Sequence, residues 1–322
     1  MKTKIWLFAL LLCCALAGCG GGGGGAGAGA IASNPPASPP VSIAAIERFA
    51  AGVSFLSPKH MVFVGTNIFV ADRTGSGRIA EINSSLQTLV SARNVASPLG
   101  IAVSSNGVYY TAIDANGDDG IYLLGNGSSL VALSPSNDFG GLTFYSTTNL
   151  FVANGTSVLV YSSADNFSVS TQSIALSAPA ALASDISKNL VYASLGNNTV
   201  VSINPSTNAT TVLTQANPNR WGPFLQPQGI SVSTNGYAYV VSQGDVHGDG
   251  GYVSKVNTAT GGSEIIVSDT VGSWGSLPIG FCQPTGVAID ANNEYLYVSN
   301  GNTCTDAVHH QNHDRILKIK LP

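Results

Sequence analysis

Six related segments of alternating apolar residues constrain the fold of this chain more than any other feature. The segments read SPKHMVFVGTNIFVAD, SPLGIAVSSNGVYYTAID, DFGGLTFYSTTNLFVAN, APAALASDISKNLVYAS, QPQGISVSTNGYAYVVS and QPTGVAIDANNEYLYVS. Each contains two apolar runs with a period of two, separated by a turn that includes Asn. This pattern indicates a β-hairpin, because alternate side chains of a strand point to the same face.

Further strands follow each hairpin. A third apolar run is found in all six repeats, as RIAEIN, GIYLLG, SVLVYS, TVVSIN, YVSKVN and RILKIK. Five repeats add a fourth run, such as LQTLV or TTVLT, and the repeats begin 40 to 57 residues apart. Four strands per repeat without a helical pattern are typical of propeller blades. The sequence therefore predicts an all-β protein, a six-bladed β-propeller of four-stranded blades.

The sixth repeat has only three strands before the sequence ends at Pro322. A blade with three strands would leave an unpaired edge at the seam of the ring. The apolar segment VSIAAIERFAAG, residues 42–53, precedes the first blade and belongs to no repeat. We expect this segment to supply the outer strand of the last blade and to close the ring.

The first 18 residues predict a signal peptide. Lys2 and Lys4 precede an apolar run from Ile5 to Leu16, which is too short to span a bilayer as a mature helix. Residues 16–19 read LAGC and resemble the bacterial lipobox, in which the cysteine is lipidated and becomes the new N-terminus. The alternative is an ordinary signal peptide that contains a cysteine.

Residues 19–41 are interpreted as the lipidated Cys19 followed by a tether rich in Gly and Pro, and residues 42–322 as the propeller. Poly-Gly is flexible and has no side chains to form a core. Gly20 stands where inner-membrane retention usually shows Asp, so we expect the bacterial cell envelope, with the outer membrane as the destination.

Charge and cysteine content limit the partners. Without Lys2 and Lys4 the mature chain keeps 11 basic and 17 acidic residues, and no basic cluster indicates nucleic-acid binding. We expect a monomer whose membrane contact is the lipid anchor.

Two cysteines, Cys282 and Cys304, lie beyond the signal peptide and the anchor. An even pair in an exported protein predicts a disulfide between them.

The pattern PxGIAV…NGxxYV resembles the NHL family of six-bladed propellers and, more loosely, streptogramin lyases and gluconolactonase/regucalcin-type enzymes. The resemblance covers residues 42–322 and implies the architecture more strongly than any activity, because one fold hosts many functions.

The loops predict which face carries a binding site. In a propeller, second-to-third-strand loops and blade-to-blade connections open on the same face. Here QANPNRWGPFLQP, QGDVHGDGG, DTVGSWGSLPIGFCQP and GNTCTDAVHHQNHD, all from blades 5 and 6 or leading into them, are the long ones. Long loops in compact domains are usually functional. The candidate ligand-binding residues on them are Trp221, Phe224, Asp245, His247, Asp249, Trp274, Phe281, His309, His310 and His313. Tryptophans that merely pack against the blade ends are the alternative.

Two segments are candidates for metal binding. His309, His313 and Asp314 could hold Zn²⁺, although their spacing is diagnostic only on a helix, which this segment does not predict. Asp114, Asn116 and Asp118 alternate like the start of a Ca²⁺ loop, but Gly125 stands where an EF-hand has its bidentate acid. A solvated loop and an Asx-type turn, respectively, are the alternatives.

Catalysis finds less support. No nucleophile elbow is present. Gluconolactonase-like enzymes hold a metal with an early Glu and an Asn before a Gly, whereas this chain has His60 in the first blade and Thr285 before Gly286. Resemblance to streptogramin lyases implies a His pair, which His247 could form with His309 or His310. We therefore favour a ligand- or protein-binding module, with a metal-assisted lyase or hydrolase and a structural scaffold as alternatives, and Ca²⁺ or Zn²⁺ as candidate cofactors.

The lipobox interpretation can be tested by replacing Cys19 with Ser. Without the thiol no acyl chain can be attached, so the variant should move from the membrane fraction to the soluble fraction. The wild type should take up labelled fatty acid in the same cells. A variant that still sediments with membranes, together with an unlabelled wild type, would contradict lipidation.

Overall fold

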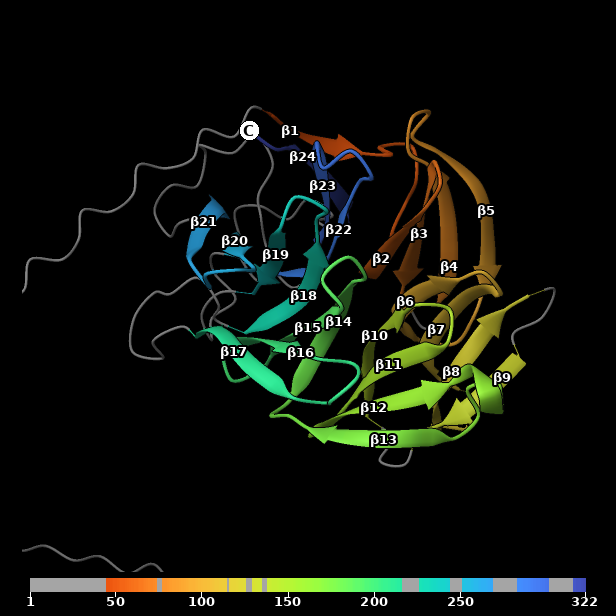
Figure 1. The fold of residues 1–322 in the computed structure, drawn as a ribbon. Helices are drawn as coiled ribbons and strands as arrows, with labels where there is room; N and C mark the ends of the chain where they lie inside the picture. Colours follow the sequence, from red (N-terminus) through yellow and green to blue (C-terminus); the bar gives the residue numbers. More distant parts are fainter. Residues whose placement is uncertain are drawn as a thin grey trace, which may run out of the picture. The chain divides into compact units, whose positions relative to one another are not determined.

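The computed structural model describes residues 45–73, 77–114, 116–125, 129–134, 138–215, 226–243, 251–268, 283–300 and 315–322. These residues form six antiparallel sheets of four strands each, arranged as the blades of a β-propeller (Figure 1). The innermost strand of every blade contacts the innermost strand of the next, and the last of them contacts the first. Within the described part of the chain, no helix is long and apolar enough to cross a membrane.

The predicted hairpins are found in every blade. Blades 1 to 3 consist of β2 (Pro58–Val64), β3 (Asn67–Asp72), β4 (Arg78–Asn83) and β5 (Thr88–Asn94); β6 (Pro98–Ser104), β7 (Gly107–Ile113), β8 (Asp119–Leu124) and β9 (Ser129–Leu133); and β10 (Phe139–Tyr145), β11 (Asn149–Asn154), β12 (Ser157–Ser162) and β13 (Ser170–Ala175). A single turn of 3₁₀-helix, Ser163–Asp165, lies between β12 and β13.

Blades 4 to 6 repeat the arrangement, and the sixth ends differently. They consist of β14 (Pro179–Asp185), β15 (Leu190–Leu195), β16 (Thr199–Ile203) and β17 (Thr210–Gln215); β18 (Pro227–Val232), β19 (Tyr237–Ser242), β20 (Tyr252–Asn257) and β21 (Ser263–Ser268); and β22 (Pro284–Ile289), β23 (Tyr295–Asn300), β24 (Arg315–Lys320) and β1 (Ala45–Phe49).

The prediction that an N-terminal strand closes the ring is confirmed. β1 pairs antiparallel with β24 from Ala45 opposite Lys320 to Phe49 opposite Ile316, and Figure 1 shows β1 beside β24 near the C-terminus. Phe49 is fully buried, and its ring meets that of Tyr297 edge-on at 4.9 Å between centroids. The strand therefore contributes core packing as well as ladder hydrogen bonds.

The hydrophobic core is divided among the interfaces between blades. One cluster of buried side chains fills each of the six interfaces, because both faces of every sheet are covered by a neighbouring blade. Strands in the middle of a blade therefore read as nearly continuous buried runs, as in β16, where every residue is buried. Outer strands alternate less and are largely exposed, as in β5.

The two faces of the ring differ in their connections. We call "loop face" the one that carries the second-to-third-strand loops and the connections between blades. We call "turn face" the one that carries the hairpin turns, such as those between β6 and β7 and between β14 and β15.

Loss of β1 should destabilise the ring. A chain beginning at residue 54 lacks this strand, so it should unfold with several kcal/mol less free energy than a chain beginning at residue 42. A chain beginning at residue 20 is the control and should match the one beginning at 42. Urea unfolding measures all three; equal midpoints for all of them would contradict the role of β1. Phe49→Ala, which leaves the ladder intact, should cost about 3–5 kcal/mol by itself.

Candidate functional site

The inner strands of all six blades contribute to one cavity on the loop face. Its volume is about 340 Å³. The second residue of each inner strand lines it: Lys59, Leu99, Gly140, Ala180, Gln228 and Thr285. Arg73, Asp138 and Gln243 join them from the loop-face ends of neighbouring strands. The binding site predicted on this face from loop lengths stays a prediction, because the residues proposed for it lie outside the described part of the chain.

The third residue of each inner strand is small in five blades and a histidine in the first. These residues are His60, Gly100, Gly141, Ala181, Gly229 and Gly286. Space explains the glycines, since a Cβ on Gly286 would lie 2.3 Å from the Lys59 carbonyl oxygen. A Cβ on Gly229 would lie 2.9 Å from the Cα of Gly286. Adjacent inner strands approach each other so closely here that larger residues do not fit.

The His60 side chain lies near the axis of the ring. It extends from blade 1, yet its Cε1 atom is only 2.8 Å from where a Cβ on Gly141 of blade 3 would stand. Its imidazole also forms a hydrogen bond with the backbone of Gln228 in blade 5. A side chain that reaches two alternate blades must cross the centre of the channel. It is surrounded by protein and lines the cavity with its remaining surface.

His60 is neutral at pH 7. Burial lowers the pKa of its imidazole to about 4 from the usual 6.5, and the positive charge of Lys59 acts in the same direction. The hydrogen bond to the Gln228 backbone acts in the opposite direction but is the smallest of these effects. A neutral imidazole has one donor and one acceptor nitrogen, so it can recognise polar groups without carrying charge.

Blade 1 fixes the position of Arg73 through its buried neighbour Asp72. The Asp72 carboxylate accepts hydrogen bonds from the backbone N–H of Leu56 and of Ser57, at 3.0 and 2.8 Å. It also accepts one from Arg78 Nε at 3.0 Å. The Arg73 N–H donates to the Ser57 carbonyl at 2.9 Å, which ties the start of β2 to the end of β3.

Asp138 also lines the cavity and is held there by the connection into blade 3. Its N–H donates to Ser134 Oγ at 3.3 Å, and its carbonyl accepts from the Gly155 N–H at 3.1 Å. Behind it, burial raises the pKa of Asp119 to about 6, while a hydrogen bond from the Phe139 N–H opposes this and the negative charge of Asp138 adds to it.

Buried hydroxyl groups bond the bulged inner strands to one another. Thr285 Oγ1 donates to the Pro58 carbonyl at 2.8 Å, and Ser299 Oγ donates to the Lys59 carbonyl at 2.6 Å, so both link blade 6 to blade 1. Thr111 Oγ1 makes the corresponding bond from blade 2 to the Gly140 carbonyl of blade 3 at 2.7 Å. These bonds set the backbone that presents Lys59 and His60 to the cavity.

Most site residues predicted from the loops lie outside the described residues. They are Trp221, Phe224, Asp245, His247, Asp249, Trp274, Phe281, His309, His310, His313 and Asp314. The same holds for Cys19, Cys282 and Cys304, so the lipidation and the disulfide stay predictions. The segments that carry the predicted ligand-binding residues join strands whose ends lie on the loop face.

The segment of Asp114 forms a turn stabilised by its own carboxylate. Asp114 Oδ1 accepts from the N–H of Asn116 and of Asp118, at 2.8 and 3.0 Å. These bonds explain the alternating polar residues as an Asx-type turn, and Ca²⁺ binding here stays a prediction. Among the described residues, no group of three His, Cys, Asp or Glu side chains is placed to hold a metal.

The axial cavity residues were not among the predicted site residues, although the sequence contained a signal for His60. Comparing the six repeats position by position shows His60 in a column that otherwise contains only Gly and Ala. An exception of this kind marks a place where one blade departs from the packing rule of the other five. The polar residues Arg73, Asp138 and Gln243 had no such signal, because they lie at strand ends of variable sequence.

Comparison with known proteins agrees with the fold. No family model matches the chain, and no curated protein is detectably similar to it in sequence. A Bacteroides thetaiotaomicron protein of unknown function has a TM-score of 0.62 at 14% identity, covering 85% of this chain and 75% of that one. The PQQ-bound aldose sugar dehydrogenase of Streptomyces coelicolor has a TM-score of 0.60 at 15% identity, covering 88% and 99%. A chain of the nidogen/laminin complex has a TM-score of 0.56 at 16% identity, covering 73% and 86%. The chain is a six-bladed β-propeller.

The low pKa of His60 predicts an acid-sensitive contribution to stability. Between pH 6.5 and about pH 4, the imidazole of His60 is protonated in the unfolded chain but neutral in the folded chain. Stability contributed by the neutral form is therefore lost as pH falls through this window, up to about 3 kcal/mol. Urea unfolding between pH 7 and pH 4 should show the wild type losing more stability than His60→Gln.

Asp119 provides the control of opposite sign. Its raised pKa means that the folded chain takes up a proton near pH 6, which stabilises it as pH falls. As the pH falls from 7 to 4, the free energy of unfolding of Asp119→Asn should therefore increase less, or decrease more, than that of the wild type. Parallel pH profiles for the wild type and His60→Gln would contradict the burial of a neutral imidazole.

Proposed function

We propose that this chain is a lipid-anchored, extracytoplasmic β-propeller that binds a small polar ligand in the loop-face cavity. The observation that carries the proposal is His60, a neutral imidazole that crosses the channel where five blades have Gly or Ala. Filling the channel with a partly desolvated polar side chain is costly unless the group has partners, and a ligand in the cavity would supply them.

The lining of the cavity favours a polar ligand of modest size. Gln228 and Gln243 offer amide donors and acceptors, Arg73 offers a positive charge and Asp138 a negative one. Ligand sites commonly have volumes of about 300–1,000 Å³, so a cavity of about 340 Å³ fits a single small molecule. A protein partner would need a broad surface, whereas these groups converge at the bottom of a hollow.

Propellers of similar fold serve both kinds of recognition. One neighbour is a sugar dehydrogenase with bound PQQ, and another belongs to a complex of nidogen with laminin. Because the identities are 15% and 16%, they support only the capacity of the fold for binding or scaffolding. The choice of a small molecule here depends on the cavity itself.

The alternatives give different results in a metal analysis. A metal-assisted lyase or hydrolase would use the loops of blades 5 and 6, so the purified full chain should contain stoichiometric zinc or calcium. A binding module or a structural scaffold should contain none. Elemental analysis after purification without metal-affinity resin decides between these outcomes.

The binding proposal is tested with the full chain carrying Cys19→Ser, screened by thermal unfolding against sugars, organic acids and amino acids. A ligand present at 100 times its Kd stabilises the protein by about 2.7 kcal/mol, which is a readily measured increase in Tm. We expect His60→Ala and Arg73→Gln to weaken the best compound by tenfold or more in calorimetric titration. Lys255→Gln is the matched control, because Lys255 pairs with Glu264 on the outer part of blade 5. A screen without any stabilising compound, or binding that both site variants leave unchanged, would contradict the proposal.

A further inference from the structure

A second cavity opens on the turn face of the same channel. Its volume is about 480 Å³, and its lining residues are distinct from those of the loop-face cavity. The fourth residue of every inner strand contributes to its wall: Met61, Ile101, Leu142, Leu182, Ile230 and Val287. All six side chains are apolar and buried, so they form a continuous hydrophobic ring around the channel.

The chemistry of this cavity is the reverse of that on the loop face. None of the described residues that line it carries a charge, whereas Lys59, Arg73 and Asp138 line the other cavity. Its polar groups are hydroxyls, among them Thr143 and Ser184, whose oxygen atoms lie 3.4 Å apart on neighbouring blades. A charged ligand would lose its hydration here without a counter-charge, at a cost that an uncharged ligand avoids.

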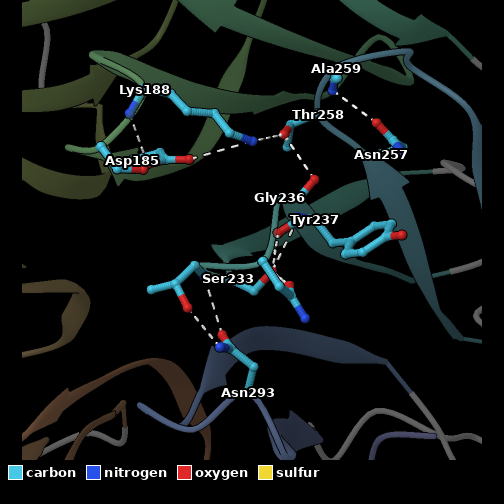
Figure 2. Close-up of polar contacts among 12 residues, drawn as sticks. Asp185, Lys188, Ser233, Gly236, Tyr237, Asn257, Thr258, Ala259 and Asn293 are labelled. Carbon is cyan, nitrogen blue, oxygen red and sulfur yellow. Dashed lines mark hydrogen bonds and ion pairs between the residues drawn. The ribbon is translucent and has the colours of Figure 1, made fainter.

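Hairpin turns of different blades are tied together on the turn face. Figure 2 shows Lys188, in the turn after β14, between two partners. Its Nζ lies 3.8 Å from Asp185 Oδ2 and donates a hydrogen bond to Thr258 Oγ1 of blade 5 at 2.5 Å. Asn293 in turn donates to Thr234 Oγ1 at 2.7 Å, joining blade 6 to blade 5 (Figure 2). The turn of Lys188 also carries Ile186, which lines the cavity although the residue is 64% exposed.

We propose that the turn-face cavity is a second binding site, which takes one uncharged, largely apolar small molecule. The hydrophobic ring holds the apolar body, and the hydroxyls near the rim accept one or two hydrogen bonds. A volume of about 480 Å³ lies within the usual range for small-molecule sites. The site is independent of the ligand proposed for the loop face.

A matched pair of fluorescent probes tests the ligand class. N-phenyl-1-naphthylamine is neutral, and 1-anilinonaphthalene-8-sulfonate has the same ring system with an added negative charge. The folded full chain carrying Cys19→Ser should bind the neutral probe saturably, one per chain, and the sulfonate at least tenfold more weakly. Equal binding of both probes, or no saturable binding of the neutral one, would overturn the proposal.

Variants locate the bound probe. Ala183→Phe and Ser231→Leu place larger side chains inside the turn-face cavity, so each should weaken the neutral probe tenfold or more. Val212→Phe is the control on exposed β17, where 61% of the valine is accessible, and should have no effect. Arg73→Gln in the loop-face cavity should also have none. Circular dichroism verifies that each variant is folded. Two filling variants are used so that the test can still be made if one of them does not fold. Unchanged affinity in a folded filling variant would rule out this cavity.

Discussion

Pairing between β1 and β24 is the interaction on which the rest of the structure depends. It completes blade 6 with a strand from the other end of the described chain, so that β22 can pack against β2 and the ring closes. The hydroxyls of Thr285 and Ser299 then reach the carbonyls of Pro58 and Lys59 across the seam. Without closure, β2 and β22 would each have a neighbouring inner strand on one side only.

Closure also brings six inner strands so close together that their third residues have almost no room. Four glycines and one alanine satisfy this constraint, since a Cβ on Gly100 or Gly286 would meet the backbone of the next blade below 3 Å. The exception, His60, is directed into the channel and is held neutral there by burial. A packing rule imposed by the ring thus explains both the glycines and the unusual environment of the one histidine.

The same ring separates two chemical environments along one channel. The second residue of each inner strand lines a polar cavity, and the fourth residue of each lines an apolar one. Side chains at equivalent positions of the six inner strands lie at the same depth in the channel. A change from polar to apolar residues along the inner strand therefore becomes a change from a polar to an apolar lining along the channel axis. Two cavities of different chemistry follow from one repeated strand.

The sequence by itself determined the blades. Alternating apolar runs, Asn-containing turns and a missing fourth strand predicted every sheet and the closure by residues 42–53, because strand periodicity and edge pairing are local properties that a sequence records. Only the tertiary structure decided that the loop face has a cavity and which residues line it: Arg73, Asp138 and Gln243 are far apart in the sequence and lie around one cavity because the ring closes. His60 was visible in the sequence as an exception among small residues. Its contacts with blades 3 and 5, and the burial that keeps it neutral, depend on distances across the channel that no local pattern encodes.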